Sequence, residues 1–172
     1  MVIFWYALLV LVAGVRFVEL GVAKRNRAWA MERGGVESGA EHYPVMVALH
    51  TALFVGCLLE VPLADRPFLP WLGWPMLVLL AGAHALRWWC IRTLGPQWNT
   101  RVIRVPDAPL VTGGPYRWLR HPNYVAVVVE GFSLPLVHTA WVTALAFTVL
   151  NGLLLRVRLR VENEALATAP AG

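Results

Sequence analysis

Five long apolar runs, separated by shorter polar segments, set the pattern of this chain. A helix needs about 20 apolar residues to cross a bilayer, or about 17 at the short end. The runs that reach this length, or nearly do, are Val2–Ala23, Pro44–Val61, Trp71–Ile91, Pro122–His138 and Thr139–Val157. The last two are almost contiguous, so we predict a tight helical hairpin with its tip at residues 133–138. The pattern therefore predicts an all-α integral membrane protein with about five transmembrane helices.

Composition agrees with a membrane location. The chain has 172 residues, of which 58% are hydrophobic and only 15% are charged, and its mean hydropathy is +0.58. Soluble domains carry more charge than this. We predict a single domain over residues 1–172, because the helices must bury their polar positions against one another. Cys57 and Cys90 lie inside apolar runs, so we interpret them as small core residues and not as a disulfide. The first run lacks the basic start and the cleavage site of a signal peptide, so we expect it to be retained.

Basic residues gather after the first, third and fifth runs, and only Arg66 falls in a loop on the other side. They are Lys24, Arg25, Arg27, Arg33, Arg92, Arg101, Arg104, Arg117, Arg120, Arg156, Arg158 and Arg160. By the positive-inside rule, the N-terminus lies outside and the C-terminus lies in the cytoplasm, as expected for a multi-pass protein of the inner membrane. The net charge of +5 is then explained by contact with anionic lipid headgroups and needs no nucleic-acid partner.

The densest cluster of polar and aromatic side chains lies at residues 114–124, directly before the fourth run. It contains His121 and Tyr124, so groups able to bind a polar ligand stand at the edge of the predicted bilayer. A second polar segment closes the fifth run and contains Arg158 and Glu162. His121 and Arg158 are 37 positions apart (158 − 121), a spacing that a helical hairpin would bring back to one face.

Structural interpretations of these residues stand beside the functional ones. Proline is favoured in the first turn of a helix, so His121-Pro122 can simply begin one. Arg117, Arg156 and Arg160 are better explained as anchors at the lipid headgroups than as catalytic groups.

Four stretches of the two segments form a familiar pattern. They are Leu110-Val111-Thr112, Gly114-Pro115-Tyr116, Arg120-His121-Pro122-Asn123-Tyr124 and Arg158-Leu159-Arg160-Val161-Glu162-Asn163-Glu164. Together they resemble the isoprenylcysteine carboxyl methyltransferase family, integral membrane enzymes that use S-adenosylmethionine. One position departs from the family, in which an Arg is followed four residues later by two Glu. The second Glu is Asn163 here, and Glu164 is the candidate substitute.

The N-terminal half of the chain resembles one subgroup of this family more closely than the family as a whole. Its residues are similar to those of a short bacterial subgroup of the family, which is associated with type III polyketide synthases. The stretches concerned are Arg16–Leu20, Ala23–Asn26, Glu41–Pro44, Trp89–Gly95 and Trp98–Thr100. Members of this subgroup methylate an oxygen of long-chain alkylpyrones or alkylresorcinols.

The resemblance also implies roles for individual residues. The residues at cofactor-contact positions are Ala108, Pro109, Leu110, Val111, Tyr116, His121, Pro122, Asn123, Tyr124 and Glu162. Arg158 falls at the substrate-contact position, where a cation would hold an anionic acceptor oxygen. It is the first catalytic candidate, followed by His121 as the nearest plausible base, and Trp98 is a candidate for lining the acceptor pocket. No set of His, Cys, Asp or Glu has the spacing of metal ligands, so we expect no metal.

The sequence therefore predicts a methyltransferase with a cytoplasmic S-adenosylmethionine site and a lipophilic acceptor held among membrane lipids. A hydroxypyrone is acidic enough to arrive as an anion, whereas a resorcinol hydroxyl has a pKa near about 10 and needs activation. A type III polyketide synthase is the expected partner protein. The alternatives are carboxyl methylation of an isoprenylcysteine-like thioether acid, a phospholipid-type N-methyltransferase, an NADPH-dependent membrane reductase and a non-catalytic partner that keeps the fold.

Ionisable residues inside the apolar runs form a separate group, because a charge in lipid is costly. Arg16 and Glu19 are three residues apart on one helical face, so we expect them to pair. We expect the others to point into the bundle; they are His50, His84, Arg87 and Glu130. For Glu130 and His84 a structural hydrogen-bonding role is favoured over a catalytic one.

Overall fold

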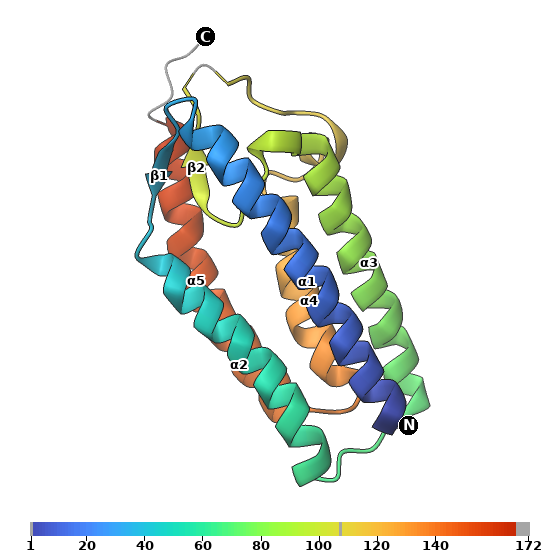
Figure 1. Cartoon of the computed structure of the whole chain (residues 1–172). Coiled ribbons are helices and arrows are strands. Elements are labelled where there is room, and N and C mark those ends of the chain that lie inside the picture. Colours follow the sequence, from blue (N-terminus) through green and yellow to red (C-terminus); the bar gives the residue numbers. More distant parts are fainter. Residues whose placement is uncertain (1, 107, 168–172) are drawn as a thin grey trace.

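Five long helices run side by side in a bundle that is elongated along one axis (Figure 1). The fold is described from a computed structural model, which describes residues 2–106 and 108–167, with side chains for residues 3–106 and 108–163. The helices are α1 (Val2–Met31), α2 (His42–Leu63), α3 (Pro70–Leu94), α4 (Pro122–Leu136) and α5 (Trp141–Ala167). Each of the five predicted runs overlaps one of them.

Two helices extend well beyond the apolar runs that predicted them. α1 continues from Ala23 to Met31, and α5 continues from Val157 to Ala167. The polar ends are stabilised by contacts with other segments. In α1, the amide of Asn26 donates hydrogen bonds to the carbonyls of Gly95 and Trp98, at 3.0 and 2.8 Å. Hydropathy alone therefore places these helix ends too early.

The predicted hairpin between α4 and α5 is present, but its turn lies at residues 137–140 and not at the predicted tip, residues 133–138, because α4 continues to Leu136. Thr139 takes a positive φ of 54° in this turn. The two helices approach closely at Gly131, where an added Cβ would lie 2.1 Å from the Phe147 ring. The carboxylate of Glu60, on α2, accepts hydrogen bonds from the backbone N–H groups of residues 142 and 143. It thereby satisfies free N–H groups at the start of α5.

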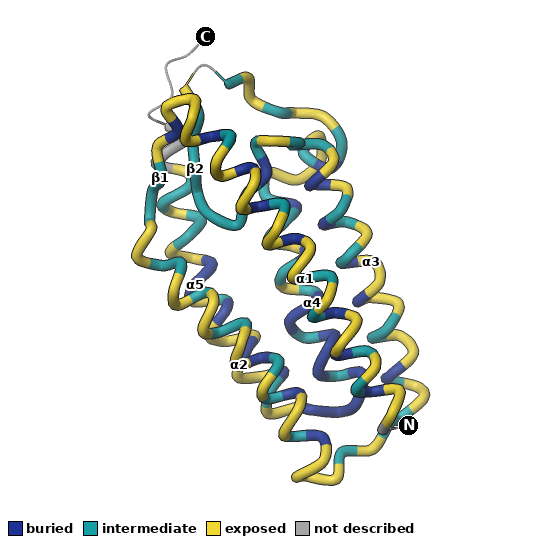
Figure 2. The backbone as a smooth tube through the Cα atoms, viewed as in Figure 1, coloured by how far each residue is buried: buried dark blue, intermediate teal, exposed yellow. Residues whose placement is uncertain are grey.

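Three helices are long and apolar enough to cross a membrane: Ile3–Met31, His42–Leu63 and Trp141–Asn163. The prediction of about five spans is confirmed only to this extent. α4 has 15 residues, or about 22 Å of helix, against about 30 Å of hydrocarbon. Buried positions concentrate on α4, while the outward faces of α1, α2 and α3 are largely exposed and apolar (Figure 2). Such a surface suits lipid better than water.

The prediction of a purely helical fold is wrong in one respect, because the chain also forms a small sheet. β1 (Val36–Ser38) pairs antiparallel with β2 (Val102–Arg104), and Glu37 lies opposite Ile103. Each strand has only three residues, and the pairing joins segments far apart in the chain, so no local pattern signals it. Two short 3-10 helices, η1 (Gly95–Gln97) and η2 (Gly114–Arg117), complete the elements.

Two apolar clusters hold the bundle together, one toward each end. The cluster near the N-terminus of α1 includes Trp5, Cys57 and Phe147. The other cluster consists of Ala23, Cys90, Ile91 and Trp98. Cys57 and Cys90 are buried and free, as predicted.

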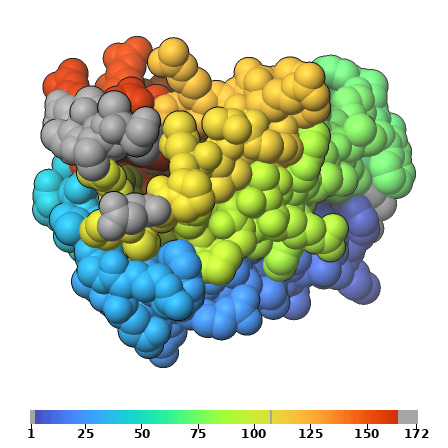
Figure 3. All heavy atoms as spheres, turned by 90° about the horizontal axis from the view of Figure 1, so that it is seen from above, coloured from blue at the N-terminus to red at the C-terminus, as the bar shows by residue number. Residues whose placement is uncertain are grey.

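The polar segments meet at one end of the bundle, which we call the polar end. It comprises the C-terminal ends of α1, α3 and α5, the sheet, the segment between α3 and α4, and the start of α4 (Figure 1). Viewed from above, the segment that follows β2 lies across this end, with α4 and the end of α5 beside it (Figure 3). The predicted gathering of basic segments on one side of the bundle is therefore present in the fold.

Candidate functional site

The hairpin brings the two sequence motifs into direct contact at the polar end. The Tyr124 hydroxyl, on the first turn of α4, donates a 2.6 Å hydrogen bond to Glu162 Oε2 on α5. His121 Nδ1 lies 3.6 Å from Glu162 Oε1. The His121 and Tyr124 rings stack with centroids 5.6 Å apart. These three residues, which we call the carboxylate cluster, confirm that the motifs converge.

Pro122 explains why these side chains stand where they do. It occupies the first turn of α4, where its fixed φ suits the helix and its missing N–H costs no hydrogen bond. His121 therefore precedes the helix, and Tyr124 projects from its first turn. The structural interpretation of His121-Pro122 and its functional interpretation are both compatible with this geometry.

Arg158 lies one helical turn before Glu162 on the same face of α5. Its Nη2 donates a 2.8 Å hydrogen bond to the carbonyl of Thr100. Its guanidinium carbon lies 5.7 Å from the centroid of the Tyr124 ring, and its Nη1 contacts the sulfur of Met46 on α2. Arg158 thus joins the carboxylate cluster to α2 and to the segment before β2.

A recess opens beside Arg158, with a volume of about 290 Å³ that includes open solvent. Its lining consists of Glu37, Ser38, Gly39, His42, Tyr43, Arg101, Val102, Arg158 and Val161. The sheet, the start of α2 and one face of α5 supply these residues. Arg158 both lines the recess and lies beside Tyr124 of the carboxylate cluster.

The wall of the recess opposite α5 is held by ionic contacts that the sequence did not suggest. Arg101 Nη1 pairs with Glu37 Oε1 across the sheet. The Arg101 guanidinium carbon also lies 3.7 Å from the centroid of the Tyr43 ring, and Arg27 Nη2 lies 3.2 Å from Glu37 Oε2. Burial alone would raise the pKa of Glu37, but hydrogen bonds from Arg101 and Arg27 outweigh it, so the pKa is lowered. Glu37 is therefore an ionised carboxylate at neutral pH.

Other predicted cofactor-contact residues surround the carboxylate cluster. Tyr116 lies in η2, where burial and then its neighbour Cys90 raise the pKa of the phenol, so it stays neutral. η2 begins at Gly114, which has a positive φ of 55°, and an added Cβ there would lie 2.4 Å from Thr93 Oγ1. Asn123 Oδ1 is buried and has no hydrogen-bond partner among the described residues. Such an unpaired acceptor is suited to a ligand that donates a hydrogen bond.

The other residues predicted to contact the cofactor or the acceptor have no contact with the carboxylate cluster among those described above. Residues 108–111 form part of an exposed segment after β2, in which the Pro109 carbonyl accepts a 3.3 Å hydrogen bond from Gln97. The structure places Trp98 in the apolar cluster with Cys90. Trp98 is only 2% exposed and does not line the recess. Asn163 is exposed, and the side chain of Glu164, its candidate substitute, lies outside the described residues.

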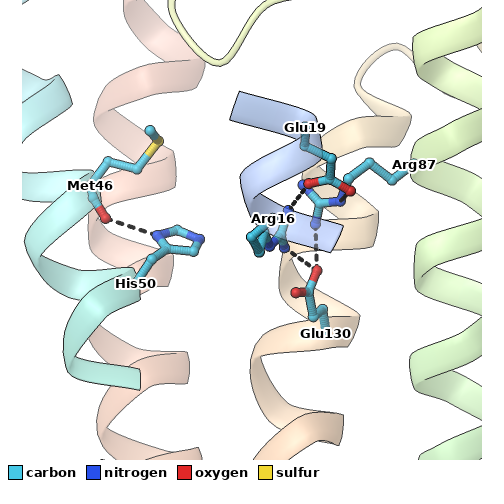
Figure 4. Close-up of polar contacts among 6 residues, drawn as sticks. All are labelled: Arg16, Glu19, Met46, His50, Arg87 and Glu130. Atoms are coloured by element: carbon cyan, nitrogen blue, oxygen red, sulfur yellow. Dashed lines mark hydrogen bonds and ion pairs between the residues drawn. The ribbon is translucent and has the colours of Figure 1, made fainter. Parts of the chain in front are cut away.

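A second polar group, the mid-bundle network, joins Arg16, Glu19, Arg87 and Glu130 (Figure 4). Arg16 pairs with both Glu19 and Glu130. Arg87 Nη2 lies 2.6 Å from Glu130 Oε2, and its Nε lies 3.6 Å from Glu19 Oε1. The predicted Arg16–Glu19 pair is confirmed, and Glu130 accepts hydrogen bonds as expected. The connection of α1 to α3 and α4 through these four residues was not predicted.

The two histidines of the apolar runs differ in their contacts. His50 Nδ1 lies 2.8 Å from the Met46 carbonyl one turn away on α2, and Figure 4 shows its ring turned toward Arg16 and Glu130. His84 has two buried ring nitrogens without a hydrogen-bond partner among the described residues, so its predicted hydrogen-bonding role has no partner group in this structure.

Comparison with known proteins assigns the family. Residues 76–168 match the model of the isoprenylcysteine carboxyl methyltransferase (ICMT) family. The chain is 37% identical to the uncharacterized protein YpbQ of Bacillus subtilis (strain 168), over 95% of this chain and 96% of that one. It is 23% identical to an uncharacterized protein of Haemophilus influenzae, over 91% of both chains.

A solved structure shares the fold. The eukaryotic intramembrane Ras methyltransferase ICMT superposes with a TM-score of 0.59 at 24% identity, covering 73% of this chain and 46% of that one. The chain thus spans less than half the length of that enzyme. The family model covers more than half of the present chain and includes the carboxylate cluster and Arg158. The chain therefore belongs to the isoprenylcysteine carboxyl methyltransferase family.

Proposed function

We propose that this protein transfers a methyl group from S-adenosylmethionine to an oxygen of a lipophilic acceptor, an alkylpyrone or alkylresorcinol of the polyketide type. Members of its family are membrane methyltransferases that use S-adenosylmethionine. The observation that carries the proposal is the position of Arg158, which contacts Tyr124 of the carboxylate cluster and also lines the recess. A cofactor on one side of Arg158 and an acceptor on the other would meet at this side chain.

The residues of the carboxylate cluster fit the cofactor chemically. Glu162 offers a carboxylate to ribose hydroxyls or an ammonium group, and the Tyr124 hydroxyl fixes its orientation. The unpartnered Asn123 Oδ1 offers a further acceptor. The aromatic rings of His121 and Tyr124 suit a neighbouring cation. Backbone groups of residues 108–111 are the proposed contacts for the adenine, by resemblance to the family.

When bound beside the carboxylate cluster, S-adenosylmethionine would supply a methyl group on a sulfonium, which an acceptor oxygen next to Arg158 could take up by displacing the sulfur. Arg158 would hold that oxygen as an anion by a charge-assisted hydrogen bond, and catalysis is then largely a matter of positioning. A hydroxypyrone that arrives as an anion needs no base. For a neutral resorcinol, His121 is the proposed base. Its Nδ1 faces Glu162, so Nε2 is the nitrogen left to accept the proton.

The membrane setting follows from the arrangement of charge. We propose that the polar end lies at the cytoplasmic surface of the inner membrane, with the N-terminus outside, because the basic segments gather there. The cofactor would enter from the cytoplasm, and the lipid tail of the acceptor would enter from the bilayer. Delivery of the acceptor by a type III polyketide synthase remains a prediction.

Carboxyl methylation of an isoprenylcysteine-like acid is the second candidate. The family match favours it, and the related solved structure is described as a Ras methyltransferase. A carboxylate would also suit Arg158. Two arginines on the recess lining disfavour a cationic amine acceptor, and hence an N-methyltransferase.

The first experiment is calorimetric titration of the detergent-purified chain with S-adenosylhomocysteine, with NADPH titrated in parallel. We expect S-adenosylhomocysteine alone to bind. Glu162→Gln should weaken that binding at least about tenfold, because it removes a charged acceptor. Glu32→Gln, at an exposed position, is the matched control and should bind normally. Binding of NADPH alone would contradict the proposal and favour a membrane reductase. Binding of neither ligand by the folded protein would favour a non-catalytic role.

A further inference from the structure

The recess has a second guanidinium group, that of Arg101, whose role is assigned neither by the family resemblance nor by the sequence motifs. Five of its lining residues come from the segment 37–43, ahead of the part of the chain that matches the family model. The recess therefore combines Arg158, from the part that matches the family model, with residues that lie ahead of that part.

Arg101 is held in place before any ligand binds. Its Nη1 pairs with Glu37, its guanidinium stacks on Tyr43, and its backbone N–H donates to Asn99 Oδ1 at 3.1 Å. Among the described residues, Nη1 is the only guanidinium nitrogen of Arg101 that has a hydrogen-bond partner. The remaining donors are thus fixed in direction and available to a ligand.

The charge of the lining favours an anion. Arg101 and Arg158 contribute two positive charges and Glu37 one negative charge, a formal balance of +1 without His42. Arg27, on the outer side of Glu37, adds a further positive charge close by. An ammonium group entering the recess would meet two guanidinium groups, whereas a delocalised anion would complement both.

We propose that the recess is the head-group site for an acceptor whose head is a planar, delocalised anion with two oxygens, such as a hydroxypyrone anion. Arg158 holds the oxygen that receives the methyl group, and Arg101 holds the second oxygen. This assignment rests on the proposed methyl transfer, because that reaction gives the anion its place next to the cofactor. Arg101 is thereby the residue that selects an anionic acceptor over a neutral phenol or an amine.

The reaction itself would weaken binding of its product. As the methyl group moves, a C–O bond forms, the C–S bond breaks, and its electron pair stays on sulfur. The acceptor anion becomes a neutral ether and the sulfonium a neutral thioether. The ether no longer offers a charged partner to Arg101, so the product is held less tightly than the substrate.

The test is a binding titration on the full chain in detergent, followed by tryptophan fluorescence. The probes are a hydroxypyrone with a long alkyl chain, its methyl ether and an alkylammonium of the same chain length. We expect the hydroxypyrone to bind best. Arg101→Met should weaken its binding by about 10- to 100-fold, while leaving the ether and S-adenosylhomocysteine unaffected. Arg25→Met, at an exposed position of α1, changes the net charge equally and should change nothing.

A second variant guards against simple loss of folding. Glu37→Gln keeps a hydrogen-bond acceptor for Arg101 but removes the negative charge from the lining, so it should tighten hydroxypyrone binding by about two- to fivefold. If Arg101→Met and Glu37→Gln both weaken all three probes, the ion pair only maintains the wall and the inference is overturned.

The two proposals fail in different ways. If S-adenosylhomocysteine binds but Arg101→Met leaves the affinity for the hydroxypyrone unchanged, the proposed head-group site is wrong. The proposal of methyl transfer is then unaffected. If S-adenosylhomocysteine does not bind but Arg101→Met weakens hydroxypyrone binding, the recess is an anion site. The proposed methyl transfer is then contradicted.

Discussion

The mid-bundle network and the wall of the recess are built from the same residue types, yet their surroundings differ. In the network, the side chains of Glu19, Arg87 and Glu130 are only 3–5% exposed, and two Arg balance two Glu. In the recess wall, Arg101 and Glu37 are 27% and 12% exposed, and both side chains line the recess.

This difference separates a stabilising role from a binding role. A buried charge depends on its partners, because the surroundings cannot solvate it once a partner is removed. A partly exposed pair is screened by water and contributes little to stability. We therefore expect substitutions in the network to affect folding, and substitutions in the recess to affect ligands.

The largest effect is expected for Glu130→Ala. It leaves Arg16 and Arg87 without the carboxylate that both contact, and such a loss typically costs about 3–5 kcal/mol. Thermal unfolding of the detergent-solubilised protein, followed by circular dichroism, measures the change. Glu32→Ala removes an exposed carboxylate, 75% accessible, and serves as the control. Equal melting temperatures for Glu130→Ala and Glu32→Ala would contradict the stabilising role of the mid-bundle network.

A smaller effect, confined to activity, is expected for Arg158→Met. The Met side chain keeps much of the stem of Arg158, so melting temperature and S-adenosylhomocysteine affinity should change little. Turnover of a hydroxypyrone should fall about 100- to 1,000-fold, because the charge that holds the acceptor oxygen is gone. A radiolabelled methyl-transfer assay measures it, with Arg160→Met on the same helix as control. Full turnover in Arg158→Met would contradict its proposed role.

The smallest effect is expected for the pH dependence contributed by Glu37. Its pKa is lowered in the folded protein from an ordinary value of 4.5. The stabilisation is therefore present above that pH and is lost as the pH falls through the lower, folded-state value. Because the pair is partly exposed, it amounts to less than about 1 kcal/mol. Unfolding of the wild type and of Glu37→Gln should differ most above about pH 5 and converge in acid; a constant difference would contradict this.

The sequence predicted the helices and the meeting of the two motifs because both depend on local patterns. Apolar length predicts a helix, and a short connection between two helices makes them antiparallel neighbours. His121 and Glu162 meet for that reason. Arg158 lies beside Tyr124, and its role in the reaction stays a prediction.

The contacts that the sequence did not predict join residues distant in the chain. Glu37 and Arg101 are 64 residues apart, and Arg16 and Glu130 are 114 apart. Neither pair leaves a periodic signal, since each depends on how whole helices pack. Trp98 was expected at the acceptor pocket, but the amphipathic character of tryptophan suits an apolar cluster equally well. A sequence alone cannot separate these two environments.

The pairing of β1 with β2 has an evolutionary consequence. β2 belongs to the segment that matches the family model, and β1 does not. The sheet thus joins a segment ahead of the family match to the part of the chain that carries the carboxylate cluster. If the proposed head-group site is right, substitutions in β1 and at the start of α2 would change the wall of the recess without changing the carboxylate cluster. In such a division, the specificity for the acceptor and the binding of the cofactor would depend on different segments of the chain.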